Sequence, residues 1–250
     1  MTGIFTTLFK PLLTKGVTIA WENRQHLITF FKTKTSFKNK DIRFSISYLF
    51  KIQIPNSNKY LLVLNRRIDN QLQPVGGAYK RYGDDSLFNK WGYKPDNKNN
   101  GLSVDNKSTS DLRFMIKGRY VLDVIKWFES MQERETDPKR ELKEELLNTG
   151  ILKKEIFEEI THKHIRRFSK NLVWSDFFKC YEVLVYDVFE LKPNEVQSQA
   201  LIELSKQQTD LKKGFAIVEC DDIEQLRFMQ EDKQIARIGQ HTKLIINKTF

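Results

Sequence analysis

Residues 140–150 read Arg-Glu-Leu-Lys-Glu-Glu-Leu-Leu-Asn-Thr-Gly, and this stretch decides the fold. The spacing of Glu141, Glu144 and Glu145 places all three carboxylates on one face of an α-helix. Carboxylates this close repel one another unless a cation compensates them, and Mg²⁺ prefers such oxygen ligands. The sequence therefore predicts that Glu141, Glu144 and Glu145 bind Mg²⁺, with Glu144 and Glu145 as the catalytic candidates.

An ordinary surface helix is the alternative interpretation of the same residues. Glutamate-rich surface helices are common, and Lys139 and Lys143 can neutralise the acids as exposed pairs of little energetic weight. The helix itself is predicted over residues 136–150 on either interpretation. Asp137 can cap its start with Pro138 at the first helical position, and Gly150 can end it.

The segments before this helix predict strands. Residues 41–54 alternate apolar and polar side chains, and residues 59–66 form a continuous apolar run, so we expect a hairpin of two strands. Gly76 and Gly77 follow Pro74-Val75, where paired glycines indicate that the backbone approaches another group closely. Residues 78–110 are predicted to be irregular, and 96–110 a flexible insertion nearly free of core residues.

The remaining segments predict a mixed arrangement of strands and helices. Strands are expected at 111–115, 157–168, 176–191 and 214–218, helices at 195–207 and 221–228, and either type at 120–128 and 235–246. The fold class is therefore α/β (α+β), with a mixed β-sheet sandwiched between helices. Residues 1–40 are predicted to be a basic helical extension, and residues 41–250 one domain with an insertion at about 78–128.

Composition limits the class of partner. The net charge of +10 favours anionic partners such as nucleotides, nucleic acid or membrane phosphate, although a merely basic surface gives the same number. Cys180 and Cys220 lie in apolar stretches without metal-ligand spacing, which is typical of buried free thiols in a reducing compartment. We expect a cytoplasmic protein, since the sequence has neither a long apolar run nor the apolar core of a secretory signal.

Several basic residues and two glycines are candidate ligand-binding residues. Arg66 ends a predicted strand, and Lys80 and Arg81 follow Gly76 and Gly77, where they can contact a phosphate or a base together with Tyr82. His162 and His164 alternate on a predicted strand and, with Arg166 on the same face, can bind phosphate; a solvated polar face is the alternative. His241 and Glu219 are weaker candidates for a ligand contact and an additional acid.

The acidic segment resembles the second half of a Nudix box, Arg-Glu-apolar-x-Glu-Glu-x-x-Gly-apolar. Here Gly150 comes late, after the extra residues 147–149. The front half of the box starts with Gly-Gly and carries a Glu eight residues before the Arg, a position that is Gln132 here; Glu133 and Glu135 are nearby substitutes. Gly76-Gly77 follow a predicted strand, but roughly 50 residues separate them from the helix. The resemblance thus implies a Nudix box split by an insertion.

The order of the pieces is similar to one Nudix branch, the SMODS-associated Nudix domain found with CD-NTase-type nucleotidyltransferases in bacterial antiphage systems of the CBASS type. The matching pieces are 45–50, 59–63, 74–77, 111–113, 127–135 and 235–245, within a resemblance that covers about residues 41–247. Relatives often carry N-terminal transmembrane helices, which we do not expect in this chain.

Two functions follow from the resemblance. The first is a sensing or processing protein of antiphage defence that binds a cyclic oligonucleotide or nucleotide signal, with a CD-NTase system partner and a homodimer as further expectations. The second is a Mg²⁺-dependent Nudix hydrolase that cleaves a nucleoside diphosphate derivative, an activity that the split and degenerate box leaves uncertain. A third reading, RNA binding through a basic surface, lacks an RNA-binding signature and ranks last.

Overall fold

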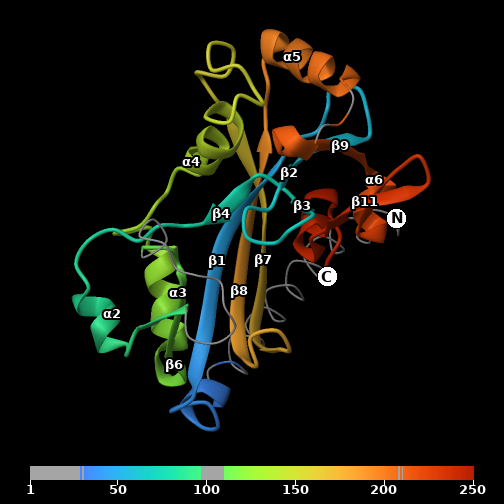
Figure 1. The fold of residues 1–250 in the computed structure, drawn as a ribbon. Coiled ribbons are helices and arrows are strands. Elements are labelled where there is room, and N and C mark those ends of the chain that lie inside the picture. Colours follow the sequence, from blue (N-terminus) through green and yellow to red (C-terminus); the bar gives the residue numbers. More distant parts are fainter. Residues whose placement is uncertain (1–28, 30, 97–109, 208, 210) are drawn as a thin grey trace, which may run out of the picture.

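The computed structural model describes residues 29, 31–96, 110–207, 209 and 211–250 (Figure 1). Its first sheet has six strands, in the order β5-β6-β1-β8-β7, with β4 paired to β1. These strands are β1 (Asp41–Lys51), β4 (Gly76–Ala78), β5 (Lys94–Pro95), β6 (Arg113–Lys117), β7 (His162–Ser175) and β8 (Cys180–Leu191). β1 runs parallel to β8 and antiparallel to β4 and β6, so the sheet is mixed, as predicted.

A second sheet, which the sequence did not predict, has five strands in the order β10-β11-β3-β2-β9. Its strands are β2 (Lys59–Leu64), β3 (Gln71–Gln73), β9 (Phe215–Glu219), β10 (Arg227–Gln230) and β11 (Lys233–Ile238). It is also mixed, because β11 and β3 are parallel while the other pairs are antiparallel. The molecule therefore has an α/β architecture with two mixed sheets rather than one.

The prediction of a hairpin between the first two strands is wrong, apart from the turn that connects them. β1 and β2 belong to different sheets, and the chain just after β1 meets β2 only at an isolated bridge between Gln53 and Tyr60. β1 lies inside its sheet with both faces covered, so its polar positions are not in solvent as alternation suggested. Arg43 shows the consequence: it is buried and ion-paired with Asp96 and Glu182.

The helices pack on two apolar cores. Buried side chains of β1, β6 and β8 form the first core with helices α3 (Val121–Glu129), α4 (Lys139–Leu142) and α5 (Glu195–Lys206). The second sheet, α6 (Cys220–Gln225) and the 3₁₀ segment η5 (Gln240–Ile246) form the second core against Leu49 and Val188. Figure 1 shows α3 and α4 beside β1, with α6 and β11 on the other side.

The segment 78–110 is more regular than expected, because it contains α2 (Ser86–Lys90) and β5. The strand expected at 111–115 is present as β6, which pairs with β1, and the segment 120–128, for which either type was expected, is helical: α3 follows the 3₁₀ turn η2 (Gly118–Tyr120). The segment predicted to be flexible falls almost wholly on residues 97–109, which lie outside the described part. The predicted N-terminal extension also lies outside it, apart from Thr29 and residues 31–40, of which 31–34 are helical.

Other boundaries need smaller corrections. β7 begins at His162 rather than 157, and β8 begins at Cys180 because Lys179 adopts a positive φ of 52° in the preceding turn. α6 begins at Cys220 rather than 221, with Glu219 at its N-cap position. Phe228 belongs to β10, and 235–246 divides into the end of β11 and η5. Within the described residues no helix is long and apolar enough to cross a membrane.

The two cysteines are free thiols, as expected. Both Cys180 and Cys220 are only half-buried, so the expectation of full burial is wrong. Cys180 is the first residue of β8 and Cys220 begins α6. Burial nevertheless raises the pKa of both thiols, which lowers their reactivity at neutral pH.

His241 should make the protein less stable in mild acid. Its ring stacks on Tyr186 with centroids 6.1 Å apart, and burial lowers the pKa of His241 to about 4. The unfolded chain takes up this proton near pH 6.5, so stability is lost as pH falls below that value. We expect wild type to lose about 1–2 kcal/mol more than a His241→Phe protein between pH 7.5 and 5 in urea unfolding. Equal losses in the two proteins would contradict this role.

Candidate functional site

The acidic helix starts and ends near the predicted residues, but it is not a regular α-helix. α4 begins at Lys139 with Pro138 at its N-cap position, one residue later than predicted, and Asp137 accepts a hydrogen bond from the Lys139 N–H, 3.1 Å away. α4 continues as the π-helical turn η3 (Lys143–Leu147), in which the Asn148 N–H bonds to the Lys143 carbonyl. A π turn accommodates an additional residue in a helix, consistent with the late arrival of Gly150. Gly150 has a φ of +75°, as expected of a helix stop.

The glycine pair permits β4 to lie against this helix. A Cβ at Gly76 would stand 2.1 Å from the Tyr48 carbonyl oxygen, and one at Gly77 would stand 2.2 Å from Glu141 Oε1. Any larger residue therefore collides with backbone at the first position and with a carboxylate at the second. The close approach predicted from Gly76-Gly77 is confirmed, and it is an approach to the helix and to β1.

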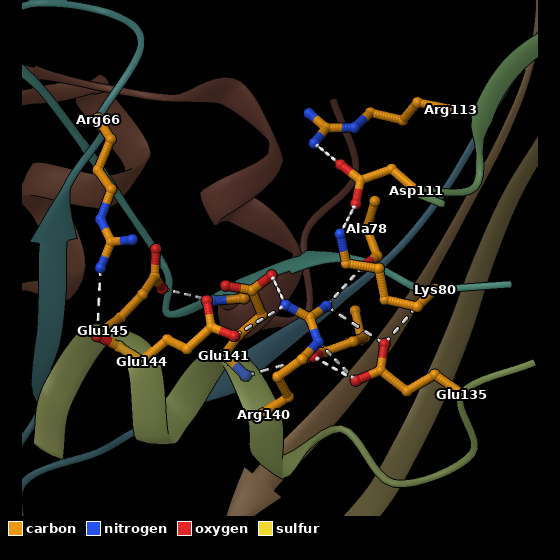
Figure 2. Close-up of polar contacts among 12 residues, drawn as sticks. Arg66, Ala78, Lys80, Asp111, Arg113, Glu135, Arg140, Glu141, Glu144 and Glu145 are labelled. Carbon is orange, nitrogen blue, oxygen red and sulfur yellow. Dashed lines mark hydrogen bonds and ion pairs between the residues drawn. The ribbon is translucent and has the colours of Figure 1, made fainter. Parts of the chain in front are cut away.

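Arg140 ties the two halves of the site together (Figure 2). Its guanidinium contacts Glu135 at 3.0 Å, Glu141 at 2.7 Å and Glu144 at 3.5 Å, and donates to the Ala78 carbonyl at 3.0 Å. Burial acts to lower the Arg140 pKa, but the bond to Glu135 and the charge of Glu141 outweigh it and raise this pKa.

Glu135 is the upstream acid of the site, rather than Gln132 or Glu133. Its side chain is buried and also accepts hydrogen bonds from the Lys80 N–H and the Tyr48 hydroxyl. Counting eight residues back from Arg140 missed it because the connecting loop turns sharply, with positive φ at Met131 and Glu133. The side chain of Glu133 lies instead near Gly83.

The three helix carboxylates have different surroundings. Glu145 is only 7% exposed, and its side chain accepts one hydrogen bond, from the Gly76 N–H at 3.0 Å. Burial raises the pKa of Glu145 to about 8 and also raises the pKa of Glu141, against the lowering effect of Arg140. Glu144 lies at the surface. The helix thus presents one buried acid, Glu145, one partly buried acid, Glu141, and one exposed carboxylate, that of Glu144.

The fit of these carboxylates to a metal ion depends on Glu145. Among the described residues, no three His, Cys, Asp or Glu side chains already converge as a metal-binding group. Arg140 lies between Glu141 and Glu144 and contacts both. The Glu145 carboxylate, however, is buried without an ion pair to any residue described, an arrangement that a cation would compensate.

A cleft of about 600 Å³ opens beside the helix, lined by Arg66, Lys80, Arg140, Glu144, Asn148 and Thr149. Arg66 comes from the loop after β2 and donates to the Glu144 carbonyl at 3.2 Å. Lys80 follows β4 and pairs with Asp111. The cleft therefore brings three cations and one exposed acid together, and two of these residues, Arg66 and Lys80, are ligand candidates predicted from the sequence (Figure 2).

Other predicted ligand residues do not line this cleft. Arg81 pairs with Asp85 and lies over the rings of Phe88 and Tyr93. His162 and His164 both pack on Phe189, and His164 contacts Asp187 at 3.2 Å. Their part in ligand binding stays a prediction.

The expectation that Arg166 shares the histidine face is wrong. A β-bulge between His164 and Arg166 re-aims the strand, and Arg166 donates to the Leu244 and Lys248 carbonyls. Arg167 takes its place, bonding to Asp187 alongside His164. Glu219 has a structural role instead, since it pairs with Lys59 and caps α6.

The place of two further residues in the site could not be predicted from the sequence. Asp111 is buried and holds both Lys80 and Arg113 (Figure 2). Tyr48 lies on β1, where its hydroxyl meets Glu135 and the Glu141 N–H. The sequence predicts only that both lie on strands, because their role depends on contacts with residues far away in the chain.

Comparison with known families identifies the chain. The profile of the SMODS-associated NUDIX domain matches residues 41–246. Comparisons with curated proteins and with solved structures found no match. The matched span runs from the start of β1 to the end of η5 and takes in the glycine pair, the insertion and the acidic helix. On this evidence the chain belongs to the SMODS-associated NUDIX domain family.

Proposed function

We propose that this chain binds a nucleotide or cyclic oligonucleotide signal in the cleft beside the acidic helix, as a sensing or processing component of bacterial antiphage defence. The family links the chain to SMODS systems and so to a nucleotide-related role. The observation that carries the proposal is the buried Glu145, which has no ion pair among the described residues and lies next in the chain to Glu144, a residue that lines the cleft together with three cations.

The cationic side of the cleft supports binding through phosphate. Arg66 and Arg140 offer planar donors suited to phosphate oxygens, and Lys80 adds a point charge. Asp111 and Glu135 hold Lys80 and Arg140 in place before any ligand arrives. Binding to such preorganised donors costs less entropy than binding to free side chains.

The acidic side supports a divalent metal as cofactor. Glu141, Glu144 and Glu145 would hold Mg²⁺, and the ion would compete with Arg140 for Glu141 and Glu144. When bound, Mg²⁺ neutralises phosphate charge and can activate water. Gly77 leaves room for the Glu141 carboxylate, and the Gly76 N–H fixes one oxygen of Glu145, so backbone orients two of the three acids.

The second candidate function is hydrolysis of a nucleoside diphosphate derivative at the same cleft. Glu144 favours it, because this carboxylate lines the cleft and is 43% exposed, where it can orient a water molecule. Glu141 and Glu145 would then be metal ligands. The proposal also includes a CD-NTase system partner and a homodimer, whose roles differ between sensing and hydrolysis.

Binding should depend on both Mg²⁺ and Glu145. Calorimetry with ADP and a panel of cyclic di- and trinucleotides is expected to find a ligand whose affinity falls at least about tenfold in Glu145→Gln. The amide can still accept the Gly76 hydrogen bond, so the loss reports the charge. Chelating Mg²⁺ should lower wild-type affinity and leave the variant nearly unchanged.

Glu155→Gln is the matched control, since it removes an exposed glutamate outside the cleft. Binding without product supports sensing, while mononucleotide release that is lost in Glu145→Gln supports hydrolysis. Failure of every ligand to bind a folded protein, or equal affinity in the two variants, would sink the proposal.

A further inference from the structure

We propose a second ligand site, for a flat uncharged heterocycle of the nucleobase class, in a cavity between α3 and the first sheet. The cavity has a volume of about 290 Å³. This is close to the lower limit of small-molecule sites, roughly 300 Å³, and suits one ring system better than a whole nucleotide. The inference uses none of the residues on which the proposed function rests.

The floor and one wall of the cavity are apolar. Phe44, Ile46 and Val185 form the floor on β1 and β8, and all three are buried. Ile125 and Phe128 of α3 form the wall. Both surfaces combine a phenyl ring with aliphatic side chains, so a flat ring between them gains dispersion and hydrophobic stabilisation from both.

The rim carries hydrogen-bonding groups of both kinds. Ser169 and Asn171 of β7 and Glu129 at the end of α3 reach the cavity. Among the described residues none of these three side chains has a hydrogen-bond partner. Together they offer the donors and acceptors that are needed to form hydrogen bonds with the polar edge of a heterocycle.

Arg167 adds a donor plane that is already fixed. Its guanidinium bonds to Asp187 at 2.7 and 2.9 Å and lies 5.0 Å from the centre of the Phe128 ring. Asp187 neutralises its charge, and Glu129 adds a negative charge at the rim. The cavity therefore favours an uncharged ligand over a phosphate, unlike the cleft lined by three cations.

A wall of aromatic rings separates the two sites. Tyr79 packs against Phe128 on one side, with centroids 5.4 Å apart, and against Tyr48 on the other, at 4.8 Å. Tyr79 also donates to Asp187, while Tyr48 bonds to Glu135 beside the acidic helix. A ligand in the cavity thus meets Arg167, which Asp187 holds, rather than the carboxylates of the acidic helix.

Nucleosides without phosphate test this site apart from the cleft. With adenosine, guanosine, cytidine and uridine as probes, ligand-observed NMR should detect at least one with a Kd below about 1 mM, unchanged by EDTA. Ser169→Trp, which fills the cavity from an exposed position, should weaken that binding at least about tenfold. Thr161→Trp, an exposed hydroxyl residue outside the cavity, should leave it within about twofold.

Asn171→Ala provides a second variant that adds no bulk, and it should weaken the same nucleoside at least about fivefold. No binding by any of the four nucleosides would overturn the proposal. So would wild-type affinity in both Ser169→Trp and Asn171→Ala, or binding that requires Mg²⁺. Because the phosphate cleft is tested with Mg²⁺ and Glu145→Gln, either site can fail while the other stands.

Discussion

Replacing Arg140 by Met is expected to lower the free energy of unfolding by about 3–5 kcal/mol. Arg140 bonds to the buried Glu135 and to Glu141, and also holds the Ala78 carbonyl. Removing it leaves a buried carboxylate uncompensated, which costs far more than the loss of a surface pair. Urea unfolding monitored by circular dichroism measures the change.

Lys139→Met is the matched control, because this neighbouring cation lies at the surface, 3.8 Å from Asp137. Its replacement should lower the free energy of unfolding by less than about 1 kcal/mol. Adding Glu135→Gln to Arg140→Met should recover part of the loss, since the uncompensated charge is then gone. Similar costs for the two single variants, or no recovery in the double variant, would show that Arg140 does not hold the site together.

Replacing Gly76 by Ala should lower the free energy of unfolding, measured in urea, by at least about 3 kcal/mol. The glycine has a φ of +151°, and an added Cβ would lie 2.1 Å from the Tyr48 carbonyl oxygen. That contact is with backbone at the centre of the first sheet, where Leu49 pairs with Gly76, so relief requires β4 to move away from β1. Movement of β4 also withdraws the Gly76 N–H from Glu145.

Gly150→Ala separates backbone strain from collision. Gly150 also has positive φ, +75°, but nothing lies within 4 Å of an added Cβ. Its replacement by alanine should lower the free energy of unfolding by only about 1 kcal/mol, which is the strain of holding alanine in the left-handed backbone conformation. If both variants lost the same stability, close packing of the glycine pair would not be what the site requires.

The features that the sequence predicted well are local. The acidic helix, its start near Asp137 and its stop at Gly150 depend on neighbours within a few turns, as does α5, which was expected at 195–207. The close approach at Gly76-Gly77 was also predictable, since few other roles require two adjacent glycines after a strand. What they approach, Tyr48 and Glu141, was not.

The features that the sequence missed depend on contacts between distant residues. β1 lies beside β8 rather than β2, a pairing across more than a hundred residues that alternation in one strand does not encode. The pair of Lys80 with Asp111 and the choice of Glu135 over Gln132 likewise arise where the insertion folds back on the helix. The bulge that turns Arg166 away from the histidines left no mark in the spacing of residues 162–166.

Crystals soaked with Mn²⁺, as a stand-in for Mg²⁺, and ADP test the central claim most directly. The account predicts an anomalous peak about 2.2 Å from the carboxylate of Glu145, shared with Glu141 or Glu144. Phosphate oxygens should lie within hydrogen-bond distance of Arg66 or Lys80, the cations that line the cleft. Metal and phosphate bound elsewhere, with Arg140 still in contact with Glu141 and Glu144, would contradict a nucleotide site at the acidic helix.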